Sequence, residues 1–153
     1  MSHRKKRLQK LIDHRSSEVD DRLLKLAQAR MQEEQARQLV EREEAKLAHA
    51  REERAQAVSG PVEVKSLTLS NDWMVSCARR ADLARQVLER AGRAVSAAQT
   101  AVITAKNELR KIELIFQRIS TEERVHAERV EQRLTDEFSA LRVAASEKRR
   151  GES

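Results

Sequence analysis

An apolar heptad ladder in the second half of the chain is the feature that most restricts its fold. Counting in sevens, one set of positions holds Leu88, Val95, Val102, Leu109 and Phe116, and the set three residues later holds Ala91, Ala98, Ala105, Ile112 and Ile119. Apolar residues at alternating steps of three and four form the seam of a coiled coil. Because many of these positions are alanine, the partner helix must approach closely or supply large side chains.

The composition argues against an ordinary globular core. Charged residues make up 37% of the 153 residues and aromatic residues 2%, with two Phe and one Trp. A thin seam between helices needs few large side chains, and such a composition is typical of long helices. No apolar run approaches the roughly 20 residues of a membrane span, and no signal peptide is evident. Cys77 is the single cysteine, which fits a reducing compartment, so we expect a cytoplasmic protein.

A turn near Ser59-Gly60-Pro61 divides the chain into two helical segments. Glycine terminates helices well, and proline directly after it cannot continue one. The following residues, 62–71, are often β-branched or small, and Asn71 or Asp72 is a suitable N-cap. We therefore predict a single domain over 1–153, with a first helix over 4–58, a turn over 59–71 and a second helix over 72–149.

The first helix supplies a partner for the ladder. It carries an apolar heptad phase of its own, made of Ile12, Val19, Leu26, Val40 and Leu47. Residues 33–53 are net acidic and residues 78–98 net basic, which indicates that the two segments face each other. The prediction is an all-α, long antiparallel two-helix coiled-coil hairpin. The expected register places Ile12 by Ile119, and Leu26 by Ala105, so that large side chains meet small ones.

This register leaves the end of the second helix without a partner. Beyond about residue 125 nothing remains in the first helix to cover it, so we predict an overhanging C-terminal helix. Ser120-Thr121-Glu122-Glu123 has the pattern of a capping box, which allows a kink or a fresh helix start near 120–127. The uncovered face carries Val130, Leu134, Phe138 and Leu141, and we expect function to lie there.

Catalysis is not expected. The four histidines have no metal-ligand spacing with one another or with Cys77, and the acidic residues are spread along helices. Two helices form no deep cleft for a substrate. We therefore predict a protein that is not an enzyme and that has no catalytic residue, metal or cofactor.

Two other sequence features suggest contacts with partners. The basic start, Arg4-Lys5-Lys6-Arg7, is a frayed solvated terminus, a nucleic-acid contact or a docking site for an acidic protein surface, and we prefer the protein to the nucleic acid. Trp73 lies by the turn with Leu67, Leu69 and Met74 nearby. It either covers the end of the hairpin or anchors a partner.

The chain resembles the FliJ/YscO family, small soluble stalk proteins of flagellar and virulence-associated type III export machines. The resemblance covers nearly the whole chain. It rests on the basic start leading into Leu8-x-x-Leu11, on the glycine-containing turn near residue 60, and on Arg129-Val130-Glu131-Gln132 followed by Asp136-Glu137.

The resemblance implies a non-enzymatic stalk whose paired ends enter a hexameric export ATPase, and which also contacts an export gate protein and secretion chaperones. It would reach the membrane only through these partners. The residues implied to face the ATPase are Arg4, Lys5, Lys6, Arg7, Leu8, Leu11, Arg15, Glu131, Gln132, Leu134, Phe138 and Leu141. Those implied to face the gate or chaperones are Leu67, Leu69, Trp73 and Met74. The alternatives are a self-associating coiled-coil scaffold and, third, a basic nucleic-acid-binding coiled coil.

Overall fold

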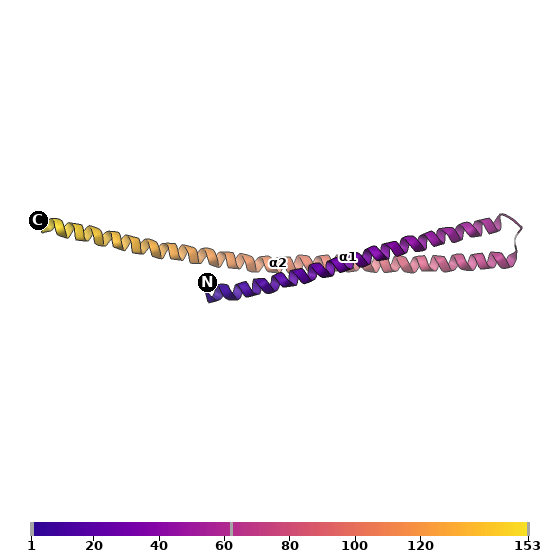
Figure 1. Ribbon diagram of the computed structural model, residues 1–153, viewed down its shortest axis with the longest axis horizontal. Coiled ribbons are helices and arrows are strands. Elements are labelled where there is room, and N and C mark those ends of the chain that lie inside the picture. The colour runs from indigo at the N-terminus through magenta and orange to yellow at the C-terminus, as the bar shows by residue number, and fades with distance from the viewer. Residues whose placement is uncertain (1, 62, 153) are drawn as a thin grey trace. The chain divides into compact units, whose positions relative to one another are not determined.

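The protein is an all-α hairpin of two antiparallel helices. The computed structural model describes residues 2–61 and 63–152, which contain α1 (His3–Val58) and α2 (Val64–Gly151) and no strand (Figure 1). The chain divides into two units, one formed by residues 17–106 and the other by residues 1–16 with 107–153. In each unit a segment of α1 lies beside a segment of α2 that runs in the opposite direction.

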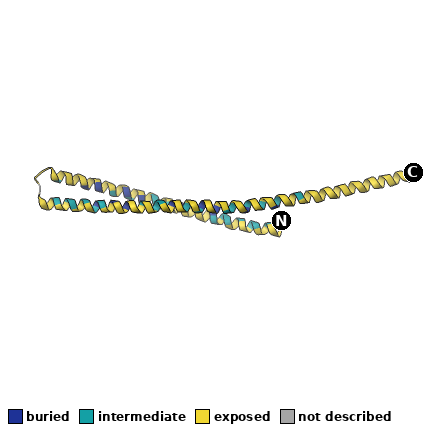
Figure 2. Cartoon of the chain, turned by 180° about the vertical axis from the view of Figure 1, so that it is seen from behind, coloured by how far each residue is buried: buried dark blue, intermediate teal, exposed yellow. Residues whose placement is uncertain are grey.

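The unit formed by residues 17–106 contains the turn and most of the buried seam. Its buried residues recur at intervals along each helix and are coloured dark blue in Figure 2. They are Val19, Leu26, Ala36, Val40, Leu47 and Ala50 in α1, and Cys77, Ala81, Ala84, Val95, Val102 and Ala105 in α2. The predicted seam is confirmed, and in α2 it continues toward the turn beyond Leu88. The sequence does not reveal this extension, because its residues, Cys77, Ala81 and Ala84, are small.

The predicted register is wrong by one heptad. Leu26 forms a buried cluster with Val95 and Val102, and Ala29 and Ala98 pack against this cluster. Leu26 therefore lies beside Ala98 rather than beside the expected Ala105, one heptad nearer the turn. Large side chains still meet small ones across the seam, so the size argument was sound although it did not select between adjacent heptads.

The register error follows from the length of the turn. α2 begins at Val64, so the turn predicted over 59–71 is too long, and Asn71 and Asp72 lie inside the helix rather than at its N-cap. The Leu67 backbone N–H already donates to the Glu63 carbonyl at 3.1 Å. β-branched and small residues are only weak helix breakers, because their helix propensity is lower than that of alanine by less than about 1 kcal/mol per residue. A shorter turn moves the point of chain reversal, and with it every pair along the seam.

α1 ends at the predicted residue, but the interactions that end it differ from the expected glycine C-cap. The Ser59 hydroxyl and backbone N–H both donate to the Gln56 carbonyl, at 2.9 Å and 3.3 Å. This satisfies one of the last carbonyls of the helix, which otherwise have no partner. Gly60 does not adopt the left-handed conformation that a glycine C-cap uses. The stop therefore rests on Ser59 and on Pro61 beyond it.

α2 continues through 120–127 as one helix. The Thr121 hydroxyl donates to the Gln117 carbonyl one turn earlier, at 2.9 Å, as threonine does inside a helix. The fresh helix start suggested by the capping-box pattern is therefore wrong. Within residues 2–61 and 63–152, neither helix contains an apolar stretch long enough to cross a membrane.

Candidate functional site

The start of α1 is held against α2 by a small polar cluster, which we call the Glu123 clamp and define as Ser2, Lys5 and Glu123. The Ser2 hydroxyl accepts the Lys5 backbone N–H at 3.3 Å and so caps α1. The same hydroxyl donates to one Glu123 carboxylate oxygen at 2.9 Å, and Lys5 Nζ lies 3.0 Å from the other. One carboxylate from α2 thus binds both the cap and the first turn of α1.

The electrostatics of the Glu123 clamp favour the ionised carboxylate. The hydrogen bond from Lys5, and then the one from Ser2, lower the pKa of Glu123 below its ordinary value. The Lys5 ammonium also lies 5.9 Å from the centre of the Phe116 ring, within the range of a cation–π contact. Lys5 therefore pairs with α2, whereas Arg4, Lys6 and Arg7 form no ion pair within the described residues.

A shallow groove beside the clamp combines apolar and basic side chains. It has a volume of about 580 Å³ and is lined by His3, Arg4, Arg7, Leu8, Ile115 and Ile119. Leu8 and the two isoleucines provide apolar surface, and the residues from the first turns of α1 provide the basic edge. Arg4 and Arg7 form no ion pair within the described residues. We call this feature the N-terminal groove.

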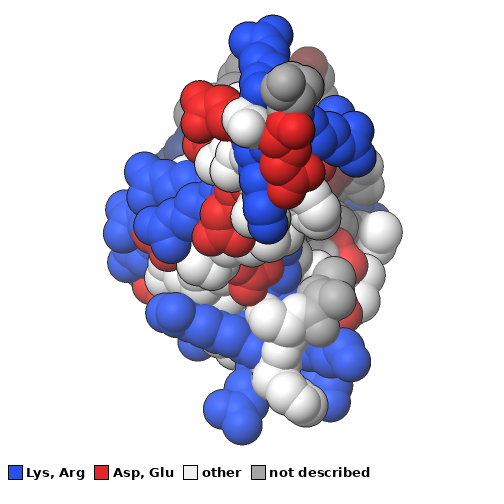
Figure 3. All heavy atoms as spheres, turned by 90° about the vertical axis from the view of Figure 1, so that its left-hand side faces the viewer, with Lys and Arg blue, Asp and Glu red and all other residues white. Residues whose placement is uncertain are grey.

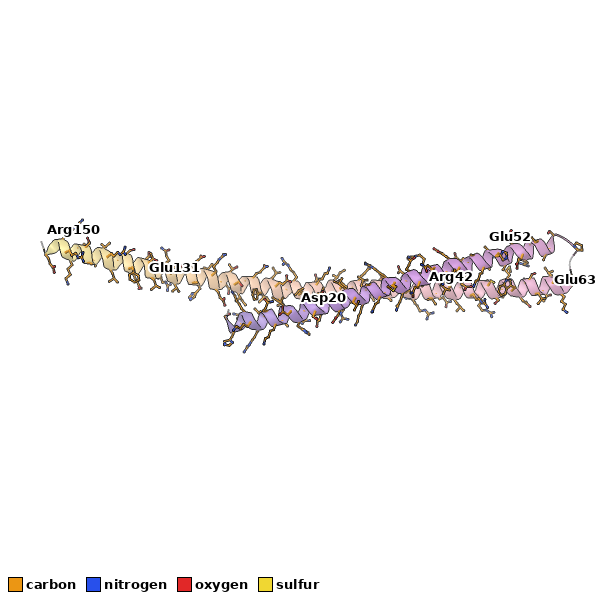
Figure 4. All side chains as sticks on the ribbon, in the orientation of Figure 1. Asp20, Arg42, Glu52, Glu63, Glu131 and Arg150 are labelled. Carbon is orange, nitrogen blue, oxygen red and sulfur yellow. The ribbon has the colours of Figure 1, made fainter. Side chains whose placement is uncertain are left out.

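Beyond the clamp, α2 is uncovered. Every described residue from 126 to 152 is exposed, and Figure 4 labels Glu131 and Arg150 on this stretch, which has no α1 beside it. Leu134, Phe138 and Leu141 are 51%, 67% and 66% exposed. The predicted overhang and its exposed apolar residues are therefore present. Such large exposed apolar side chains in a row on one helix are typical of a surface that binds another molecule.

The two groups of residues predicted to face one partner are not in contact with each other. The first turns of α1 meet α2 at Phe116, Ile119 and Glu123, whereas Glu131 and Gln132 lie farther along the overhang. Gln132 donates to Asp136 on the same helix at 3.4 Å. In the view of Figure 3, Lys and Arg side chains are seen on several sides, with Asp and Glu side chains between them.

Near the turn, the four residues predicted to contact a gate or chaperone have different environments. Met74 packs against the buried cluster of Leu47, Ala50, Cys77 and Ala81, so it belongs to the seam. Trp73 is 44% exposed, and the Arg80 guanidinium lies 5.6 Å from the centre of its ring. Leu69 is exposed and Leu67 half-buried. Trp73 and Leu69 are thus the members of this group that a partner could reach.

The described residues contain no group of His, Cys, Asp and Glu side chains that could hold a metal ion. Cys77 is fully buried in the seam and so is inaccessible as a nucleophile in this structure. The surface features that a partner could reach are the groove, the overhang and the residues near Trp73.

Sequence reasoning missed the Glu123 clamp and Ile115. Serine at position 2 is a recognisable N-cap, but the acidic residue that completes it comes from the other helix rather than from three residues later. Only the correct register brings Glu123 to Ser2. Ile115 lies off the heptad ladder, and its role in the groove appears only when its position relative to α1 is known.

Comparison with protein families gives one match that bears on the function of this chain. Residues 4–148 match the family described as "Flagellar FliJ protein". Neither the curated proteins nor the solved structures gave a significant match. The match extends over nearly the whole chain, including the basic start, the turn and most of the overhang.

Proposed function

We propose that this chain, a member of the flagellar FliJ family and a component of the flagellar export apparatus, binds the hexameric ATPase of that apparatus. In this proposal the basic start of α1 and the overhang of α2 contact the ATPase. The residues near Trp73 contact the export gate protein or secretion chaperones. The protein acts in the cytoplasm and influences ATP hydrolysis by its partner without hydrolysing ATP itself.

The observation that carries the proposal is the uncovered end of α2. Leu134, Phe138 and Leu141 lie at helical spacing, and more than half of each is exposed. Burial of a leucine or phenylalanine side chain stabilises a complex by about 1.5–3 kcal/mol. A helix that presents three such side chains to solvent is suited to insertion between surfaces of a partner.

The proposal is tested by capture of the purified export ATPase on immobilised full-length protein, together with the rate of ATP hydrolysis. A variant with serine at positions 134, 138 and 141 should lose at least about tenfold in affinity, because three apolar contacts disappear. The matched control replaces the exposed Leu24 and Met31, which lie in the other unit, with serine and should bind within about twofold of wild type. Wild-type protein that neither binds the ATPase nor changes its rate contradicts the proposal.

A self-associating scaffold is the second candidate, because the same apolar overhang could pair with a second copy. Light scattering separates the two. A monomer at micromolar concentration supports the export role, whereas a stable dimer that dissociates in the triple serine variant supports the scaffold.

A nucleic-acid-binding coiled coil is the third candidate, and the basic start of α1 is what favours it. This function requires an affinity for DNA or RNA that falls steeply with salt and disappears when Arg4 to Arg7 are neutralised. The same protein preparation can be assayed for both activities.

A further inference from the structure

We infer that the N-terminal groove binds an acidic amphipathic helix of a protein partner. The inference deepens the proposed function, since that function also directs the start of α1 toward a protein. It adds the chemistry of the segment that binds there, which is apolar along one stripe and carries carboxylates beside that stripe.

The apolar part of the groove suits the side chains of a helix. Ile119 is buried and Leu8 half-buried, so they form a floor, while Ile115 is 45% exposed at the edge. Leu11 follows Leu8 by three residues and is 40% exposed, which continues the apolar surface by one turn. A groove between two helices binds a third helix through apolar residues spaced by three or four positions.

The basic edge of the groove determines the charge of that helix. Arg4 and Arg7 are exposed and form no ion pair within the described residues, whereas Lys5 is taken up by Glu123 and Phe116. The two arginines are three residues apart on one face of α1, so two carboxylates at helical spacing on a partner can meet them. Guanidinium–carboxylate contacts are among the stronger hydrogen-bonded pairs, because both partners are charged.

The combination favours a protein helix over nucleic acid. Phosphate backbones are bound through cations and hydrogen-bond donors and make no use of an apolar floor, and single-stranded bases stack on exposed aromatic rings. Here the floor is aliphatic, and the nearest ring, Phe116, is already approached by Lys5. Aliphatic floor and arginine edge together match a helix that presents leucine and glutamate side chains.

The test uses the full-length protein and a fluorescent synthetic helix with leucine at i, i+3 and i+7 and glutamate on both sides of that stripe. Binding is measured by fluorescence anisotropy. The variant R4E/R7E reverses the basic edge. The matched control, K25E/R30E, makes the same change in net charge at two exposed cations that lie in the other unit. A second pair compares Ile115→Gln, in the groove, with Leu114→Gln, which is similarly exposed but does not line it.

R4E/R7E should weaken binding at least about tenfold, because two attractive contacts become repulsive, and K25E/R30E should change it less than about threefold. Ile115→Gln should weaken it more than Leu114→Gln. Equal loss in both charge variants, or equal binding of a peptide with glutamine in place of glutamate, overturns the inference, as does tighter binding of a single-stranded DNA oligonucleotide. The ATPase capture assay fails or succeeds independently of this peptide, so the inference and the proposed function are judged separately.

Discussion

Removal of a single leucine from the seam near the turn should destabilise the hairpin more than removal of an exposed leucine. Leu47 is 4% exposed and packs with Ala50, Cys77 and Ala81. Leu47→Ala removes three carbon atoms from this cluster, which corresponds to about 2.4 kcal/mol at about 0.8 kcal/mol per buried methylene group. A seam between two helices is open to solvent on both sides, so any cavity is readily filled. We therefore expect a loss of about 2–3 kcal/mol, at the low end of the range for buried leucines.

The matched control is Leu24→Ala, in the same helix and the same unit. Leu24 is 60% exposed, so its replacement should change the free energy of unfolding by less than about 0.5 kcal/mol. Urea unfolding followed by far-UV circular dichroism measures both, with the slope against urea used to confirm that the extent of unfolding is unchanged. Equal losses in the two variants, or a loss below about 0.5 kcal/mol for Leu47→Ala, would show that the seam does not stabilise this part of the hairpin.

Three further predictions concern the packing of Gly92, the register and the Glu123 clamp. Gly92→Ala should stabilise α2 by about 0.5–1 kcal/mol in thermal or urea unfolding, because a methyl group there would lie 3.5 Å from a Glu33 oxygen, an ordinary contact, and alanine favours helix. Leu47→Cys should form a disulfide with Cys77 on mild oxidation, detected by mobility on a non-reducing gel, whereas Val40→Cys should not, since it lies one heptad farther from the turn. The pKa of Glu123 is lowered in the folded state from its ordinary value of 4.5. The Glu123 clamp should therefore contribute its full stability at pH values above 4.5 and lose it as the pH falls through the lowered pKa. The protection factors of amides in the first turns of α1, which compare their exchange with that of an unfolded peptide at the same pH, should therefore fall at low pH in wild type and be low at every pH in Glu123→Gln.

The fold could be predicted from the sequence because its strongest signals are repetitive. Five heptads of apolar residues identify the seam, and Gly60-Pro61 identifies the place where the chain reverses. The start of α2 could not be predicted in the same way, because residues 64–72 include several β-branched and small residues, which are helical here although most of the segment is exposed. An error of a few residues in the turn then shifted the whole register by one heptad. Alanine-rich ladders tolerate such a shift, since successive heptads resemble one another.

The candidate site could be predicted only where it depends on one helix at a time. The exposed stripe of Leu134, Phe138 and Leu141 follows from its own spacing, and the basic start of α1 is evident from composition. The Glu123 clamp and the N-terminal groove each require residues from both helices. They became visible only with the correct pairing, because neither Glu123 nor Ile115 is distinctive among the many acidic and aliphatic residues of α2.

The buried Cys77 makes local opening of the hairpin measurable by thiol labelling. Its thiol is the only one in the chain and is completely covered by the seam near the turn. A thiol reagent can therefore modify the folded protein only after the two helices have separated locally. Where reclosing is faster than modification, the rate of labelling divided by that of an unfolded control gives the equilibrium constant for this separation. The natural chain thus reports how often its turn end opens, without any added probe or substitution.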